Sequence, residues 1–169
     1  AATLPPQRHR LRITAMDNQP ESSLYALILA AGASRRFGSP KQLVRIDGRP
    51  MLHAAVSRAV EVVGHSVSVV LGAHAGELAP LLSHSPASIV INRDWEQGMS
   101  SSIRAGIARI PGSVDGLLIM LCDQPSVTGE DLRRLVATWR RQPDYAAAAQ
   151  FGATTGAPAI FPRWLFREL

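Results

Sequence analysis

The chain has one cysteine, few aromatic residues and no long apolar run. The single thiol, Cys122, excludes an intrachain disulfide and a cysteine-rich zinc site within these 169 residues, and its apolar neighbours predict a buried structural thiol. No apolar segment approaches the length that a helix needs to cross a bilayer. Residues 1–23 lack the apolar centre of a signal peptide and predict a flexible N-terminal tail. We therefore expect a cytoplasmic protein with no membrane partner.

Positive charge is in excess, but it is not gathered in one place. The net charge is +5 and the isoelectric point is about 10.6, yet aromatic residues make up only 5% of the chain. Surfaces that bind DNA or RNA usually gather lysine and arginine on one face. Here the basic residues are scattered, which favours a small anionic ligand and no nucleic-acid partner. The five histidines show no pair at metal-ligand spacing, so we expect no catalytic role for them.

The most informative segment is a loop that follows a short apolar run. Residues 24–28 are apolar and predict a buried strand, and the small residues around Gly32 follow them. Small side chains let backbone N–H groups approach an anion, and Arg35, Arg36 and Lys41 add positive charge. The loop has neither the Gly-Lys-Ser/Thr ending of a P-loop nor the three glycines of a dinucleotide fingerprint. The pattern predicts a phosphate site of another kind.

The rest of the chain alternates between strand and helix patterns. Helical spacing predicts helices over 51–63, 77–82 and 99–109, and a further helix that Thr128 caps together with Asp131. Apolar runs predict strands over 66–71, 87–91, 116–121, 145–149 and 159–161. Such alternation predicts one α/β domain over 24–169, a three-layer α/β/α sandwich with a mostly parallel, Rossmann-like sheet. Ligands bind beyond the carboxyl ends of such strands, here after Ala30, Ile91 and Leu121.

The loop carries a pattern that resembles a known family. From residue 29 it is Leu-Ala-Ala-Gly-x-Ser-x-Arg-Phe-Gly-x-Pro-Lys-Gln-Leu, which resembles the signature of the MobA-like nucleotidyltransferases, in particular the branch that forms the cytidylylated molybdenum cofactor. The resemblance implies that the loop surrounds the triphosphate of a nucleotide. It assigns the backbone of Leu29, Ala30, Ala31 and Gly32 to nucleotide binding. It also assigns nucleotide binding and catalysis to the side chains of Arg36 and Lys41.

Two further segments match the same family. Asp123-Gln-Pro resembles the family's metal site and implies that Asp123 is a catalytic ligand of Mg²⁺, whereas the sequence alone reads equally as a turn. Asn92 follows a strand, and the resemblance places it near the nucleotide or metal. Gly98-Met-x-x-Ser implies nucleotide binding by Gly98 and Ser102 at a helix N-terminus. The alternative there is that Ser100 merely caps the helix.

The resemblance also implies the substrates and the reaction. Leu-Ala-Ala-Gly tends to accompany cytidine in the family, and a methyl group at Ala31 would narrow the base pocket, so we expect CTP. The segment 156–161 resembles the molybdopterin branch, although it reads equally as a turn into an edge strand. CMP would pass from CTP to molybdopterin as pyrophosphate leaves. A molybdoenzyme or its maturation chaperone would be a further partner.

Several alternatives stay open at this point. The enzyme could use GTP, transfer CMP to another phosphate acceptor, or be a nicotinamide-dependent oxidoreductase of the same fold. A non-catalytic protein that handles the cofactor is the remaining alternative. Family members usually continue to a late motif, Asp-x-Asp-Thr-Pro, that supplies a second metal ligand. The sequence to Leu169 does not contain it, so we expect a domain without its usual C-terminal end and with a one-carboxylate metal site.

Overall fold

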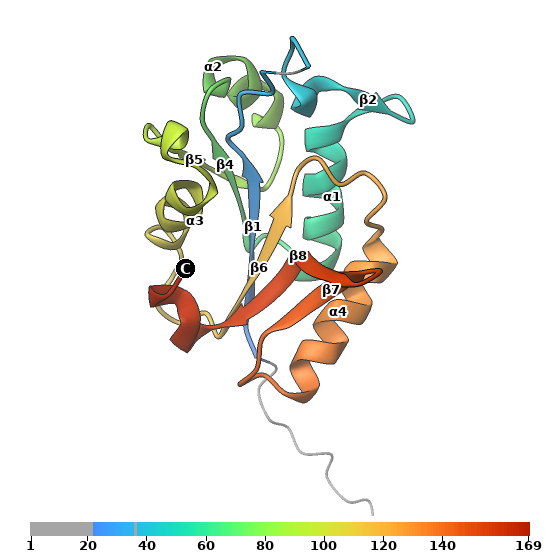
Figure 1. Ribbon diagram of the computed structural model, residues 1–169, viewed down its shortest axis with the longest axis vertical. Helices are drawn as coiled ribbons and strands as arrows, with labels where there is room; N and C mark the ends of the chain where they lie inside the picture. Colours follow the sequence, from blue (N-terminus) through green and yellow to red (C-terminus); the bar gives the residue numbers. More distant parts are fainter. Residues whose placement is uncertain (1–21, 36) are drawn as a thin grey trace, which may run out of the picture.

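The computed structural model describes residues 22–35 and 37–169. Arg36 and nearly all of the predicted tail lie outside the described residues. The domain is built on a six-stranded sheet (Figure 1). In order across the sheet, its strands are β5 (Ser88–Ile91), β4 (Val67–Leu71), β1 (Leu24–Ala30), β6 (Gly116–Leu121), β8 (Thr154–Pro162) and β7 (Ala147–Phe151).

The sheet is mostly parallel, as predicted. Neighbouring strands from β5 to β6 run parallel, whereas β8 pairs antiparallel with both β6 and β7. The prediction of an edge strand after residue 156 is wrong, because β8 lies between β6 and β7. Its pairing with β7 shifts register between Ala148 and Ala149. The small residues of this hairpin give no clear alternation, which is why the sequence understates its length.

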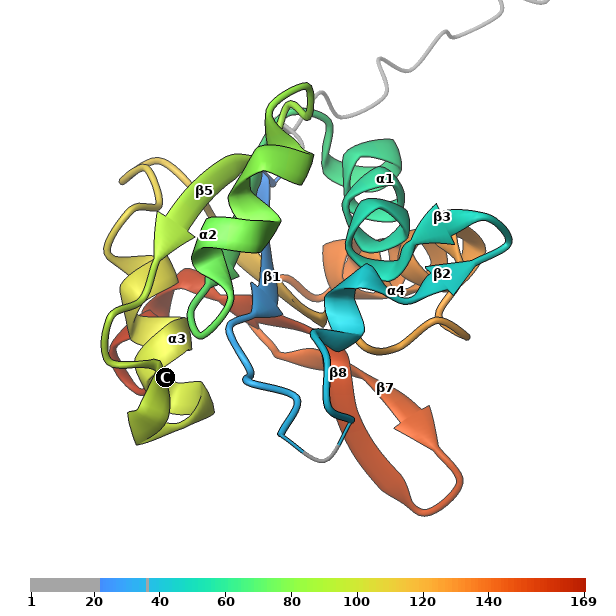
Figure 2. The same cartoon turned by 90° about the horizontal axis from the view of Figure 1, so that it is seen from above.

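Helices cover both faces of the sheet (Figures 1 and 2). One face carries α1 (Met51–Val63) and α4 (Gly129–Arg141), and the other carries α3 (Met99–Ile107) with the short helix η4 (Arg163–Arg167). The predicted helix over 77–82 is instead α2 (Ala75–Leu78) followed by η2 (Ala79–Leu82). The remaining elements are η1 (Lys41–Leu43), η3 (Trp95–Gln97) and the hairpin of β2 (Arg45–Ile46) and β3 (Arg49–Pro50).

Two predicted local features are confirmed. Thr128 is the N-cap of α4: its hydroxyl accepts from the Asp131 N–H at 3.1 Å, while the Asp131 carboxylate accepts from the Thr128 N–H at 3.0 Å. The Thr128 hydroxyl also donates to the Asp131 carboxylate at 2.6 Å, and this bond, together with the one from the Thr128 N–H, holds the pKa of the Asp131 carboxyl below its ordinary value. Cys122 is buried, as its neighbours indicated. No described helix is long and apolar enough to span a bilayer.

Alternation along the central strands divides the core between the two faces. In β1, Ala26 and Ile28 pack beneath α1 and α4, whereas Leu27 and Leu29 pack on the α3 face. Ser23, at the end of the predicted tail, donates from its N–H to Asp115 at 2.7 Å and anchors the chain before β1. The chain crosses to opposite faces on either side of β1, because α1 leads to β4 and α3 leads to β6. This strand arrangement opens a crevice at the carboxyl end of β1.

Candidate functional site

A cavity of about 390 Å³ occupies this crevice. It is bounded by the loop after β1, the end of β6 and the start of α3. The predicted residues brought together there are Leu29, Ala30, Ala31, Gly32, Lys41, Gly98, Ser102 and Asp123. Other lining residues are Ser34, Gln42, Trp95, Met99, Leu121 and Cys122.

The loop after β1 has its carbonyl groups turned into the protein. Gln42 is buried, and its amide Nε2 donates to the carbonyls of Ala30 at 2.9 Å and Gly32 at 3.1 Å. The Ala31 carbonyl accepts from the N–H of Ala73 at 3.2 Å, and the Ser34 carbonyl accepts from the N–H of Phe37 at 2.8 Å.

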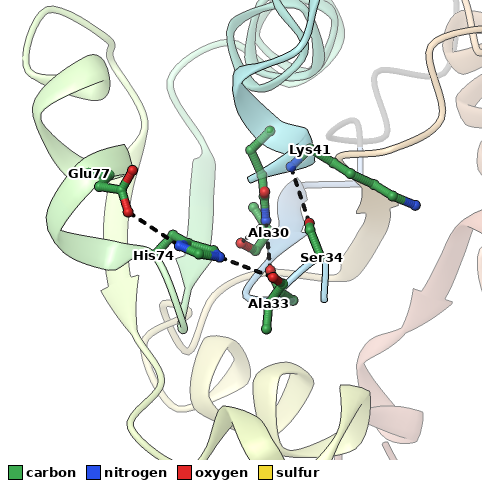
Figure 3. A network of polar contacts seen from close by, with 8 residues as sticks. Ala30, Ala33, Ser34, Lys41, His74 and Glu77 are labelled. Atoms are coloured by element: carbon green, nitrogen blue, oxygen red, sulfur yellow. Dashed lines mark hydrogen bonds and ion pairs between the residues drawn. The ribbon is translucent and has the colours of Figure 1, made fainter. Parts of the chain in front are cut away.

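Between these, the Ala33 carbonyl lies 3.1 Å from Nε2 of His74 (Figure 3). Each carbonyl from residue 30 to residue 34 therefore has a partner within the protein.

The backbone N–H groups of residues 31–35, in contrast to these carbonyls, donate to no described residue. We call residues 31–35 the anion loop. Ser34 has φ of +51°, a left-handed conformation that is uncommon for serine and that concentrates at functional sites. Its hydroxyl accepts from the Lys41 N–H at 3.1 Å. Consecutive unclaimed N–H groups around such a turn form a concave site for an anion.

Two described cations lie at the anion loop, Lys41 beside it and Arg35 at its end. Lys41 lines the cavity, and its side chain extends on the side of the loop opposite to His74 (Figure 3). Arg35 is exposed and lies 3.4 Å from the Glu96 carboxylate of η3. This ion pair borders a second hollow, of about 460 Å³, which shares Lys41 and Trp95 with the first. Arg36, the other predicted cation, lies outside the described residues.

Asp123 supplies the carboxylate on the opposite wall. It is exposed and follows β6, next to the buried thiol of Cys122. Burial, and secondarily the charge of Asp123, raises the pKa of Cys122 to about 12, so this thiol is neutral in the folded protein near neutral pH. Among residues 22–35 and 37–169, no cluster of three histidine, cysteine or acidic side chains forms a metal cage. One exposed carboxylate still fits Mg²⁺, which often uses one or two carboxylates and completes its shell with water and phosphate.

The start of α3 forms the third wall. Gly98, its N-cap, has φ of +96° and ψ of −172°, a backbone conformation essentially restricted to glycine. No side chain caps this helix, so the alternative role of Ser100 as a cap is wrong.

Asn92 lies apart from the other predicted residues. It does not line the cavity but is buried, and its Nδ2 donates to the hydroxyls of Ser101 at 2.9 Å and Ser102 at 3.0 Å. Its Oδ1 accepts from the Asp94 N–H at 2.9 Å. Asn92 therefore holds η3 and the first turn of α3 together behind the cavity.

Three residues of the site were missed from the sequence. Gln42 and His74 hold carbonyls of the loop, although no catalytic role was expected for the histidines. Trp95, which the sequence analysis did not assign to the site, lines both hollows. For Gln42 a signal was present, since it directly follows Lys41 in the family pattern. For His74 there was no such signal, because a hydrogen bond from a side chain to a distant backbone carbonyl produces no pattern of residue spacing in the sequence.

Comparison with known proteins assigns the family. The family model of the MobA-like NTP transferase domain matches residues 26–169. The chain belongs to this family of MobA-like NTP transferase domains. The match confirms the predicted resemblance and extends it through the sheet to the end of the chain.

Relatives of this MobA-like domain carry different names. Nicotine blue oxidoreductase of Paenarthrobacter nicotinovorans is 36% identical over 115 residues, covering 68% of this chain and 56% of the relative. Bifunctional protein GlmU of Streptomyces avermitilis is 35% identical over 117 residues, covering 66% of this chain and 24% of the relative. The chain thus aligns with about half, or less, of the length of these relatives.

Solved structures support the fold. Rv0371c from Mycobacterium tuberculosis H37Rv superposes with a TM-score of 0.77 at 26% identity, covering 88% of this chain and 75% of that one. A structure of Rv0371c in complex with manganese superposes with a TM-score of 0.73 at 25% identity, covering 87% and 74%.

Proposed function

We propose that this domain transfers CMP from CTP to molybdopterin with release of pyrophosphate. One observation carries the proposal: the carbonyls of residues 30–34 are all engaged within the protein, which leaves the N–H groups of residues 31–35 beside Lys41 for an anion. A triphosphate is the anion that such a loop suits, since several phosphates can each accept from backbone donors.

The chemistry needs positioning and charge more than acid or base groups. An oxygen of the acceptor phosphate attacks the α-phosphorus, the bond from that phosphorus to its bridging oxygen breaks, and pyrophosphate leaves with the bond electrons. A phosphate monoester is largely ionised at neutral pH, so no side chain has to remove a proton. Lys41 and Arg36 would bind the leaving phosphates and offset the charge that grows on them.

Asp123 would hold a divalent cation against the phosphates. Bound there, Mg²⁺ supplies positive charge to oxygens of the triphosphate. A single protein carboxylate makes the ion depend on the nucleotide for further ligands, so metal and nucleotide should bind together. The manganese complex of Rv0371c supports a divalent ion in this fold.

The choice of CTP rests on the width of the cavity near Ala31. Its methyl group is buried close to Gly72 and Trp95, so the wall beside it is already filled. A pyrimidine needs less room than a purine there. The choice of molybdopterin rests on the sequence resemblance of residues 156–161, which form part of β8.

A second candidate is a nicotinamide-dependent oxidoreductase. It is favoured by the 36% identity to nicotine blue oxidoreductase. The pyrophosphate of a dinucleotide could occupy the same anion loop. A GTP-using enzyme, a cytidylyltransferase for another acceptor and a non-catalytic cofactor carrier are distinguished by the same experiment.

The test is calorimetric titration of CTP, GTP, NADH and NADPH, with and without Mg²⁺, followed by a pyrophosphate-release assay with molybdopterin. We expect CTP to bind best, only with Mg²⁺, and to release pyrophosphate. Asp123→Asn should lose the Mg²⁺ effect, whereas Asp144→Asn, at an exposed position outside the cavity, should keep it. Metal-independent binding of a nicotinamide dinucleotide would overturn the proposal in favour of the oxidoreductase. Preference for GTP would point to the guanylyl alternative. Binding of CTP without pyrophosphate release would point to another acceptor or to a carrier, and pyrophosphate release with a different phosphate monoester would separate these two.

A further inference from the structure

His74 joins two separate segments of the chain at the back of the anion loop. Its Nε2 lies 3.1 Å from the Ala33 carbonyl oxygen, and its Nδ1 lies 3.3 Å from Oε1 of Glu77 in α2 (Figure 3). The imidazole is largely buried, with 24% of its side chain exposed, while Glu77 is 62% exposed. The histidine therefore bridges α2 and the loop.

Both partners of this imidazole are acceptors. A backbone carbonyl has no hydrogen to donate, and neither has an ionised carboxylate. A neutral imidazole carries one N–H group, so it can satisfy only one of the two contacts and would turn a lone pair toward the other oxygen. The imidazolium carries N–H groups on both nitrogens and satisfies both contacts at once.

The charges around the ring agree with this state. Glu77, from α2, is the one carboxylate that contacts His74 among the described residues. On the loop side, Arg35 and Lys41 are the described cations, and the charge of Arg35 is already paired with Glu96 of η3.

We propose that His74 is a positioning residue: as an imidazolium paired with Glu77, it holds the Ala33 carbonyl inward and so keeps the N–H groups of the anion loop turned toward the cavity. A ring with a single N–H group facing Glu77 would lose the contact with Ala33, so the hold needs an N–H group on each ring nitrogen. His74 does not line the cavity and needs no contact with the ligand. The proposal rests on the proposed function only in taking the ligand to be a nucleotide phosphate.

Two variants separate the contacts. In Glu77→Gln, the new amide can donate to Nδ1 of a neutral ring while Nε2–H still donates to Ala33, so the hold should persist at high pH. In His74→Gln, an amide replaces the ring and cannot titrate. His65→Gln is the matched control, since His65 is exposed just beyond the end of α1 and makes no hydrogen bond with the anion loop among the described residues.

The first measurement needs no nucleotide. We would follow the imidazole nitrogens of His74 and the backbone amide of Ser34, which shares a peptide group with the Ala33 carbonyl, by ¹⁵N NMR from about pH 5.5 to about pH 8.5. We expect the ring to show two N–H groups at the low end, and the Ser34 amide to move with the same midpoint. That movement should vanish in His74→Gln and remain in His65→Gln. A ring that is neutral throughout, or a Ser34 amide that ignores the titration, would overturn the proposal.

The second measurement is the affinity for Mg²⁺ with CTP, and for inorganic tripolyphosphate, over the same pH range. The ligand titrates too, so the wild type is compared with the variants at each pH. We expect the wild type to lose about tenfold more affinity than Glu77→Gln as pH rises, the size of one charge-assisted hydrogen bond.

The two proposals fail differently. Identical pH profiles in the wild type and His74→Gln, with CTP bound, would overturn the role of His74 and leave the proposed function standing. A Ser34 amide that follows His74 in a protein that binds no nucleotide would support the positioning role and overturn the proposed function.

Discussion

The two faces of the sheet are packed differently. Beneath α1 and α4 lies the larger cluster of buried residues, which includes Trp139, Leu52 and Leu132. On the α3 face the cluster is smaller, and half-buried residues such as Trp95 complete it. The cavity opens beside α3, where Met99 remains 58% exposed. We therefore expect stability to depend mainly on one face and the proposed ligand binding on the other, so that mutations should separate the two properties.

The largest effect should come from a defect in the better-filled face. Trp139 is 1% exposed, and Trp139→Ala should lower the free energy of unfolding by about 3–5 kcal/mol, measured by urea denaturation. The affinity of the folded fraction for CTP should not change. Trp164→Ala, which removes an indole that is 65% exposed, is the control and should have a small effect on stability. Weaker binding by folded Trp139→Ala would show that the two faces are coupled.

A smaller effect should follow from filling the narrow gap behind the anion loop. In Gly72→Ala, the new Cβ would lie 2.6 Å from Cβ of Trp95 and 2.7 Å from the Ala31 carbonyl oxygen, so the loop or Trp95 must shift. We expect a loss of about 1–3 kcal/mol in stability and weaker binding of CTP.

The control for that variant is Gly76→Ala in α2, where a Cβ meets nothing within 4 Å. It should be stabilising by about 0.5–1 kcal/mol, because alanine favours a helix over glycine. Thermal unfolding and calorimetry would measure both variants. Equal CTP affinity in Gly72→Ala and Gly76→Ala would contradict the tight fit of the loop.

Removing a cation from the cavity should affect binding alone. Lys41→Ala should weaken CTP binding about tenfold or more, the size of a charge-assisted hydrogen bond. Its free energy of unfolding should change by less than about 0.5 kcal/mol. Arg109→Ala removes an exposed cation outside the cavity and should change neither quantity. Unchanged affinity in Lys41→Ala would refute the assignment of the phosphate site.

The smallest effect concerns Cys122, which packs on the α1 face. Its pKa is raised from 9.0 to about 12, chiefly by burial. Above the lower value, the unfolded chain releases a proton that the folded protein keeps, so the stability due to this thiol is lost as pH rises toward the higher value. Urea denaturation from neutral to alkaline pH should show a steeper decline in the wild type than in Cys122→Ala. Equal slopes in the wild type and Cys122→Ala would show that the Cys122 thiol does not cause the decline in stability.

The central part of the fold was predictable because each element carries its own signal. Thr128 and Asp131 mark the start of α4, and the continuous apolar run of β6 marks a strand covered on both faces. The length of the β7–β8 hairpin was underestimated, since its alanines and threonines show little alternation between apolar and polar residues. Its place beside β6 is set by pairing rather than by local pattern.

The candidate site was predictable where its residues directly follow a strand. The loop around Gly32 and the carboxylate of Asp123 could be found from their spacing to strands. The roles of Gln42 and His74 could not, because both depend on which carbonyls lie nearby after folding. Asn92 could be placed at the end of a strand, but whether its amide faces a ligand or the serines of α3 depends on tertiary contacts.

The ion pair between Arg35 and Glu96 changes how the site responds to ionic strength. Both side chains are largely exposed, so the pair adds little stability and is weakened by salt. A phosphate bound to Arg35 would take the place of Glu96, so one anionic partner would be exchanged for another. Lys41 has no carboxylate partner among the described residues, so a bound phosphate would be its first anionic partner. The salt dependence of nucleotide affinity should therefore arise far more from Lys41 than from Arg35, although both residues lie at the same loop.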